Sequence, residues 1–256
     1  MSLFKELYNY REMIYMLVRR DIRGKYKGSV LGFLWTFINP LLQLLVYTLV
    51  FSVIMRNNIE KYYIYLFVAL VPWLFLSTSI NAGSTCILVS GDMVKKIYFP
   101  REVLPISCVT ASFVNMLLVF LVIFGVLIVT GFGISLYALL FLPIIMVVEY
   151  LLCLGLVLIF SALTVYFRDL SHILGIITMA WQFLTPVMYD VSMVPDHLRP
   201  VFNLNPMTPV ILAYRDILYY KQKPDLSTLL TATALGVVFL VLGAEIFRRM
   251  QKGFAE

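Results

Sequence analysis

The sequence predicts an all-α membrane protein with six transmembrane helices, an N-terminal amphipathic interface helix, and re-entrant extracytoplasmic helices between spans five and six. Of its 256 residues, 61% are hydrophobic and only 13% are charged, whereas soluble domains carry about 25% charged residues. Long charge-free runs recur along the chain, and hydrocarbon forces each run to satisfy its own backbone hydrogen bonds as a helix. The runs also lack the apolar/polar alternation of membrane barrel strands.

The spans follow from the runs between charged residues. The run 103–148 is too long for one crossing. We divide it at the turn sequence TGFG and at Pro143, because Gly and Pro punctuate helices. The fourth span then contains Glu149. The six expected spans lie near 30–55, 63–90, 104–129, 135–166, 171–189 and 227–246.

The basic residues predict the orientation of these spans. With six crossings both termini share one side, and that side receives fourteen Lys and Arg residues against six on the other. Basic residues mark the cytoplasmic side of a membrane protein, so both termini are expected in the cytoplasm. The charges sit in short clusters beside the spans, which favours binding to membrane lipid headgroups over binding to nucleic acid.

Residues 1–27 precede the first span and have the pattern of an amphipathic helix lying in the interface plane. Apolar residues recur at helical spacing, and polar residues fall on another face. The apolar set is Leu3, Leu7, Tyr10, Ile14 and Leu17, and the polar set is Lys5, Asn9, Glu12, Arg19 and Arg23. This segment is either a simple anchor or a helix that contacts a cytosolic partner.

The main cytoplasmic loop, 91–99, is short and charged. A helix there is expected to begin with Asp92 as its N-cap, since an aspartate side chain accepts from free backbone N–H groups. The loop is either a solvated turn with topogenic charges or a lever docked into another protein.

The extracytoplasmic region 190–226 contains five prolines and is largely apolar. Both features are odd for a loop in water. Re-entrant helices explain them, provided that protein buries the free backbone ends, and we favour them over an ordinary lid.

No catalytic or metal-binding motif stands out. The chain has no phosphate loop, no zinc-protease or serine-hydrolase motif and no cluster of His, Cys and carboxylates. Cys86, Cys108 and Cys153 are interpreted as small apolar residues. Glu149 is the one carboxylate well inside a span, which suggests either a proton relay or a hydrogen-bonded structural residue. An ion-coupled secondary carrier and a membrane-embedded enzyme of glycan or lipid assembly therefore remain alternatives.

Aromatic residues make up 15% of the chain, and many lie inside the expected spans. Interfacial belts and helix packing explain most of them. Aromatic rings also stack on the apolar faces of sugars, so a passage lined by them would let a glycan slide. Composition does not decide between these roles.

The tract RDIRGKYKGSVLGFLWTFINP resembles the start of the ABC-2 type permeases that export polysaccharides. The matching residues are Arg23, Tyr26, Ser29, Leu31, Gly32, Trp35 and Pro40. Further segments resemble the same family in the same order. They are VALVPWLFLSTSI, VKKIYFPREVLP, YFRDL, TPVMYDVSMVP and NPMTPVILAYRDILY.

The resemblance implies one ABC-2 type transmembrane domain over residues 1–256, acting as a permease subunit and not as an enzyme. It implies a homodimer in the bacterial plasma (inner) membrane that exports a lipid-linked cell-surface polysaccharide, such as O-antigen or teichoic acid. Two copies of a cytosolic ATPase subunit would hold ATP and Mg, with no cofactor or metal in this chain.

The resemblance, together with the stacking of aromatic rings on sugars described above, suggests two sets of residues. Those expected to couple to the ATPase are Arg19, Arg20, Arg23, Asp92, Met93, Val94, Lys95, Lys96, Ile97, Arg168 and Asp169. Those expected to line the substrate channel are Trp35, Phe37, Trp73, Trp181, Phe183 and Tyr189.

Overall fold

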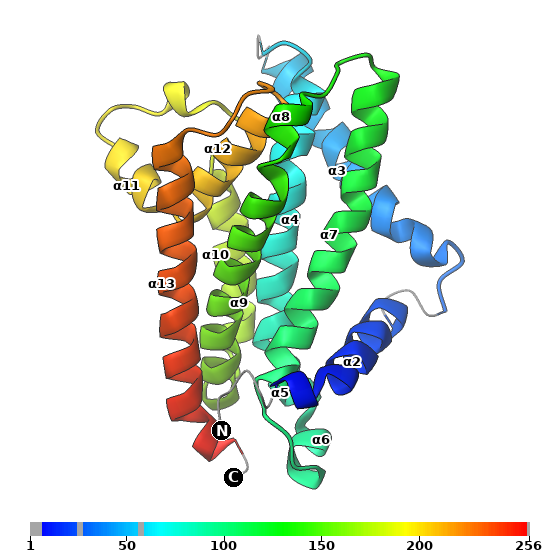
Figure 1. Cartoon of the computed structure of the whole chain (residues 1–256), viewed down its shortest axis with the longest axis vertical. Coiled ribbons are helices and arrows are strands. Elements are labelled where there is room, and N and C mark those ends of the chain that lie inside the picture. The colour runs from blue at the N-terminus through cyan, green and yellow to red at the C-terminus, as the bar shows by residue number, and fades with distance from the viewer. Residues whose placement is uncertain (1–6, 25–27, 56–58, 255–256) are drawn as a thin grey trace.

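The computed structural model describes residues 7–24, 28–55 and 59–254, and every regular element within these ranges is a helix. Figure 1 shows the long helices α4, α7, α9 and α13 running along the longest axis of the molecule. Short helices gather at its two ends. The long helices are α3 (Trp35–Thr48) with its extension η2 (Leu49–Ile54), α4 (Tyr62–Ser84), α7 (Val103–Val129), α9 (Leu142–Tyr166) and α13 (Leu226–Met250). The shorter elements are α2 (Arg11–Gly24), η1 (Gly32–Leu34), α5 (Cys86–Val89), α6 (Gly91–Lys96), α8 (Leu136–Leu139), α10 (Leu170–Phe183), η3 (Val191–Met193), α11 (Arg199–Leu204), α12 (Met207–Leu218) and η4 (Gln251–Gly253).

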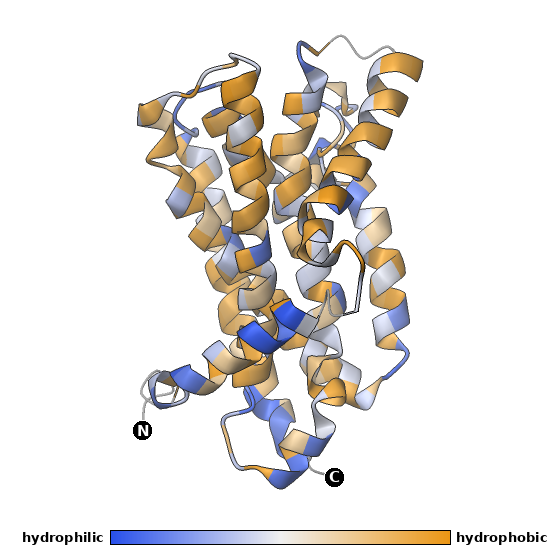
Figure 2. Cartoon of the chain, turned by 90° about the vertical axis from the view of Figure 1, so that its right-hand side faces the viewer, coloured by the Kyte–Doolittle hydropathy of each residue, from blue (hydrophilic) through white to orange (hydrophobic). Residues whose placement is uncertain are grey.

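Five helical stretches in the described part of the chain are long and apolar enough to cross a membrane. They are Gly32–Ile54, Tyr62–Ser84, Val103–Val129, Leu136–Tyr166 and Leu226–Gly253. Figure 2 shows hydrophobic residues along the length of the bundle, with hydrophilic ones gathered toward the end that carries α6 and the C-terminal residues. The protein is therefore an all-helical, multi-pass membrane protein.

The fifth expected span, 171–189, differs from the helix observed. Helix α10 begins at Leu170 but ends at Phe183 after 14 residues. The side-chain amide of Asn205 donates to the carbonyl of Leu184 and to the hydroxyl of Thr185. These bonds turn the chain out of the helix just before Pro186, which has no N–H to continue it. At 1.5 Å per residue α10 is about 21 Å long, short of the ~30 Å hydrocarbon core.

The second expected span, 63–90, is divided in the structure. Helix α4 ends at Ser84, and α5 follows as a separate turn. The hydroxyls of Ser84 and Thr85 donate to carbonyls three residues back in the chain. Such bonds compete with the helical ones and favour a break.

The short loop helix α6 begins at Gly91 and ends at Lys96, so it covers only part of the expected 91–99 segment. Its N-cap position is Ser90, and Asp92 lies within the first turn. The expectation that Asp92 caps the helix is therefore wrong. An acidic residue in the first turn still interacts favourably with the positive end of the helix dipole.

Helix α4 is the innermost helix of the bundle. Its side chains are buried on nearly all sides, by α3, α7, α9, α10 and α12. The outer helices leave large apolar side chains exposed, such as Leu45 of α3, Leu121 of α7 and Val241 of α13. In a membrane protein these faces meet lipid or another protein chain.

Helices α9 and α13 pack at backbone contact because glycines lie where they cross. A Cβ atom on Gly155 would fall 2.4 Å from the backbone of Phe239, and one on Gly243 would fall 2.3 Å from the carbonyl oxygen of Gly155. Small residues at a helix interface let membrane helices approach in this way. The contact joins the last long helix to the centre of the bundle.

Candidate functional site

One end of the bundle has its own apolar core, which we call the basal core. Helix α2 contributes Leu17, α5 contributes Ile87, α6 contributes Val94, and α13 and the residues after it contribute Phe247 and Phe254. Leu7 and Tyr10, near the start of the described chain, pack against it. The first and last described segments of the chain therefore meet at the same end of the molecule.

The residues expected to couple to a partner gather around this core. In α2 the apolar side faces α7, while Glu12, Arg19 and Arg23 are exposed. In α6, Val94 is buried and Met93 is half-buried, while Asp92, Lys95, Lys96 and the following Ile97 are exposed. Arg168 and Asp169 are exposed in the turn after α9. That turn lies at the same end, because the hydroxyl of Tyr166 donates to the carbonyl of Met250. Residues 1–6 and 25–27 of the expected interface helix lie outside the described ranges.

A hollow of about 830 Å³ opens beside the basal core. Tyr10, Tyr98 and Arg248 are among the residues lining it. The guanidinium of Arg101 donates to the carbonyl of Gln251, which fixes one wall. Its polar lining and exposed cations give this end of the molecule a surface that an acidic or polar protein segment can fill.

The aromatic residues expected to line a channel fall into different environments. Trp73 is 1% exposed and packs edge-to-face against Trp181 with ring centroids 6.0 Å apart, so its ring is enclosed by the core of the protomer. Trp181 is half-buried and donates to Asn205 over 2.9 Å. Phe183 is exposed, and its carbonyl accepts from the hydroxyl of Tyr189.

Trp35 and Phe37 lie on α3, apart from the Trp181 group. Both side chains are half-buried. The indole N–H of Trp35 donates to Ser29 over 3.0 Å, and the ring of Phe37 meets Phe33 edge-to-face. Trp35 lines a cavity of about 270 Å³ between α3, α4 and α7.

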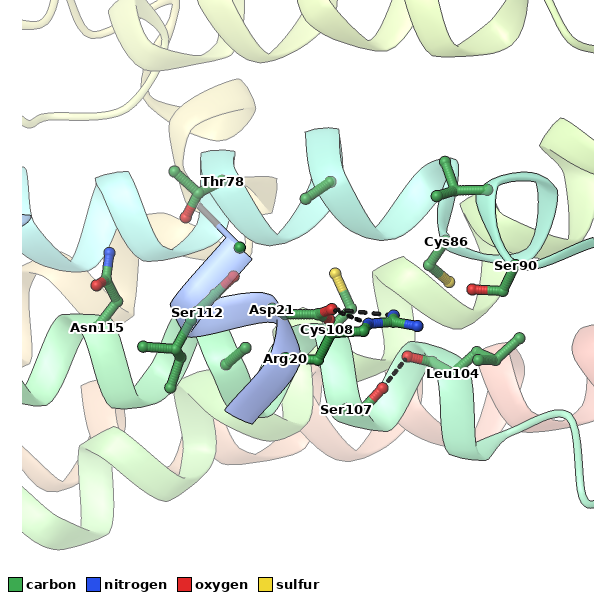
Figure 3. A pocket seen from close by; sticks show the side chains of 15 residues that line it. Arg20, Asp21, Thr78, Cys86, Ser90, Leu104, Ser107, Cys108, Ser112 and Asn115 are labelled. Carbon is green, nitrogen blue, oxygen red and sulfur yellow. Dashed lines mark hydrogen bonds and ion pairs between the residues drawn. The ribbon is translucent and has the colours of Figure 1, made fainter. Parts of the chain in front are cut away.

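This cavity continues into a second one of about 480 Å³ that reaches α2. Thr78, Ser112 and Asn115 line both. Figure 3 shows Arg20 and Asp21 of α2 at the second cavity, joined by an ion pair of 3.0 Å, with Ser112 and Asn115 on α7. Arg20 was expected to couple to a partner, whereas sequence reasoning missed Thr78, Ser112 and Asn115, because uncharged polar residues did not stand out within the expected spans. For Ser112 and Asn115 the signal that would have found them is their spacing of three residues, which puts both on one face of α7.

Glu149 has a partner inside the bundle. Its side chain is fully buried, and one carboxyl oxygen accepts from the hydroxyl of Tyr214 over 2.6 Å. Among the described residues its other oxygen has no hydrogen-bond partner. This arrangement fits a structural carboxyl group that ties α9 to α12.

Arg215 lies in the expected extracytoplasmic region 190–226, and its side chain is buried. It is 1% exposed, its guanidinium lies 3.7 Å from the centre of the Tyr65 ring, and it donates to the carbonyls of Val187 and Tyr189. A buried arginine needs such partners. Together with Glu149 it explains how α12, almost entirely buried, is held among α4, α9 and α13.

Within the described ranges no group of three His, Cys, Asp or Glu side chains is placed to hold a metal ion. Cys86, Cys108 and Cys153, all within the described ranges, form no disulfide, and His172 and His197 are exposed.

An apolar helical bundle with one charged end built from an amphipathic helix and a loop helix is the architecture of a multi-span membrane permease. The chain belongs to the ABC-2 type transporter family, whose family model matches residues 12–219. It is 37% identical over 256 residues to a Myxococcus xanthus protein named "O-antigen export system permease protein RfbA", covering 99% of this chain and 98% of that one. It is also 29% identical over 245 residues to a Klebsiella pneumoniae protein of the same name, covering 96% of this chain and 94% of that protein.

Proposed function

We propose that this chain is the membrane subunit of an ATP-driven exporter that moves a lipid-linked cell-surface polysaccharide outward across a bacterial plasma membrane. The observation that carries the proposal is the similarity to O-antigen export permeases over essentially the full length of both chains. The substrate is a polysaccharide of the O-antigen class. The same mechanism could export teichoic acid, but the similarity to O-antigen export permeases favours that substrate less.

The cytoplasmic face in this proposal is the end with the basal core. The predicted excess of basic residues on the side of the termini supports it, since basic residues mark the cytoplasmic side. The chain then crosses six times, with the short α10 and the irregular residues after it, up to Tyr189, forming the fifth crossing. Helices α11 and α12 are the re-entrant pair. Burial of α12 supports this, because backbone ends at membrane depth need protein around them.

The partner is a cytosolic ATPase subunit, present in two copies, that binds ATP and Mg. It docks on α6 and on the exposed face of α2, with Arg168 and Asp169 at the edge of the contact. Val94 and Leu17 share the basal core, so a push on α6 is transmitted directly to α2 and to the foot of α13. The purified permease alone should hydrolyse no ATP.

Two copies of the chain form the passage. The span Gly32–Ile54 is the least buried of the long helices, and α10 also exposes Ile176, Ile177 and Met179. A second copy covering these faces would enclose a passage lined by Trp35, Phe37, Trp181, Phe183 and Tyr189. Trp73 would support the ring of Trp181 from behind.

Deletion of the gene in its host tests the proposal. Surface polysaccharide should disappear and lipid-linked polymer should accumulate inside the cell. Both effects should be reversed by the wild-type chain only when the ATPase subunit is also present. Normal surface polysaccharide in the deletion strain, or restoration without any ATPase, would contradict the proposal.

A further inference from the structure

A second hollow lies at the opposite end of the bundle from the basal core. Tyr189 lines it, and it is the one residue of the proposed coupling and passage sets that does so. We call it the outer hollow. It has a volume of about 740 Å³, within the ~300–1,000 Å³ range of small-molecule sites. Its wall combines aromatic rings, carboxylates and a hydroxyl. They come from Phe51, Glu60, Tyr189, Asp190, Ser192 and Tyr220.

The aromatic wall is rigid on one side and open on the other. Tyr219 also lines the hollow, and its hydroxyl donates to the carbonyl of Glu60 over 2.6 Å. Its ring packs against Tyr65 and Phe132. Tyr220 stands at 83° to the Tyr219 ring with centroids 5.0 Å apart, and its side chain is 49% exposed. Tyr220 therefore presents an open aromatic surface on a fixed support.

The acidic wall is preorganised in the same way. One oxygen of Asp190 accepts from the backbone N–H of Ser192, and the other accepts from the hydroxyl of Tyr65. Burial acts to raise the pKa of Asp190, but these hydrogen bonds and the charge of Arg215 outweigh it and lower the pKa below its ordinary value. The carboxylate is thus ionised at neutral pH. A carboxylate can accept about four hydrogen bonds, so it keeps acceptor capacity for a ligand.

We propose that the outer hollow is a binding subsite for neutral sugar residues, in which one sugar stacks on Tyr220 and donates hydroxyl hydrogen bonds to Asp190 and Glu60. Aromatic rings match the apolar faces of sugars, and charge-assisted hydrogen bonds from hydroxyls to a fixed carboxylate are strong and directional. Two carboxylates in the wall disfavour an anionic ligand such as the phosphate of a lipid carrier. The ligand is therefore the glycan portion.

This inference rests on the proposed function, because export brings a glycan to this end of the molecule. It adds a role to that function: the emerging chain is held at the outer mouth of the permease. Half-exposed Tyr220 and exposed Glu60 offer modest contacts. Modest contacts let a polymer bind and then move on.

The test uses the purified full-length chain in detergent and the host's own surface polysaccharide, freed from lipid by mild acid. Saturation-transfer NMR should detect magnetisation passing from protein to sugar protons for the wild type. Tyr220→Ala and Asp190→Asn should each weaken binding about tenfold, as expected when one of a few modest stacking or hydrogen-bonding contacts is removed. Tyr220→Phe should retain binding, because it keeps the ring.

The matched control is Tyr137→Ala on α8, an exposed tyrosine outside the outer hollow. Thermal unfolding should show that all variants are folded. No transfer with the wild type, or equal transfer in the wild type, Tyr220→Ala and Asp190→Asn, would overturn the subsite. Export in cells is measured separately. If the wild-type chain exports polysaccharide but shows no binding of it by NMR, only the subsite proposal is contradicted. If the wild-type chain binds the polysaccharide but does not support its export, the proposed function is contradicted.

Discussion

At the scale of single residues, the interior of this protein depends on a few polar side chains that find partners there. Glu149 and Tyr214 are both completely buried and share a hydrogen bond of 2.6 Å between α9 and α12. A buried polar group without a partner costs about 1–3 kcal/mol. The pair is therefore a sensitive place to test whether Glu149 is structural.

We expect Tyr214→Phe to reduce stability by about 1–3 kcal/mol, because it leaves the Glu149 carboxyl group without its partner. Glu149→Gln should be milder, since the amide oxygen still accepts from Tyr214. Thermal unfolding in detergent measures both, with Tyr137→Phe as the exposed control. If Glu149→Gln unfolds normally yet abolishes export, the carboxyl group has a transport role and the structural interpretation fails.

Asp190 gives a pH dependence with a definite sign. Its pKa is lowered in the folded protein, so its ionised form stabilises the fold above the unfolded-state pKa of about 3.9. That contribution is lost as the pH falls through the lowered folded-state pKa. Unfolding measured from pH 7 down to pH 3 should therefore show a smaller loss of stability for Asp190→Asn than for the wild type. Parallel curves for the two proteins would contradict the assignment.

At the scale of elements, the sequence predicted the long helices better than their ends. Charge-free runs located five long spans because burial of charge is costly in hydrocarbon. The end of α10 was not predicted, because the hydrogen bonds that stop this helix come from Asn205, about twenty residues farther along the chain. The burial of Arg215 was not predicted for a similar reason, because its partners are the ring of Tyr65 and carbonyls from a distant segment. Such tertiary contacts leave no local periodicity.

The glycines at the α9–α13 contact lead to a sharp prediction. Gly155→Ala and Gly243→Ala should each destabilise the protein by about 1–3 kcal/mol, because the added Cβ meets backbone that cannot move aside. Gly125→Ala on α7 is the matched control, since nothing lies within 4 Å of its added Cβ. It should be neutral or stabilising by up to ~1 kcal/mol. Thermal unfolding compares the three, and equal effects would show that α9 and α13 are not in backbone contact.

The loop helix α6 can be tested as a coupling element. Val94→Pro should break the short helix and remove a side chain from the basal core. Lys95→Glu with Lys96→Glu should reverse the exposed charge without touching that core. Both variants should insert normally but lose ATPase binding or separate ATP hydrolysis from export. Lys223→Glu, exposed near the other end, is the control. If both α6 variants export as the wild type does, α6 is not a coupling element and its charges serve only to set the topology.

At the scale of the whole molecule, the arrangement of the ends determines the topology. Leu7 packs against the basal core, and Phe254 belongs to it, so the described chain starts and finishes at one end of the molecule. We expect cysteines placed at Tyr8 and Lys252, in a background without the native cysteines, to react only with reagents that reach the cytoplasm. A cysteine at Lys223 should react from outside. Labelling of Tyr8 or Lys252 from outside would overturn both the orientation and the docking proposal.

The short length of α10 affects the bilayer beside it. A helix of about 21 Å does not match a ~30 Å hydrocarbon layer, and lipids relieve such hydrophobic mismatch by thinning locally. In the proposed fifth crossing the chain that follows α10 is irregular, and the amide of Asn205 donates to the carbonyl of Leu184 and the hydroxyl of Thr185 there. In the proposed passage, a hydrophilic polymer moving along α10 would therefore face a dielectric barrier about two-thirds as thick as the surrounding membrane. Lengthening α10 by one turn would restore the full barrier, so it should slow transport even with every lining side chain intact.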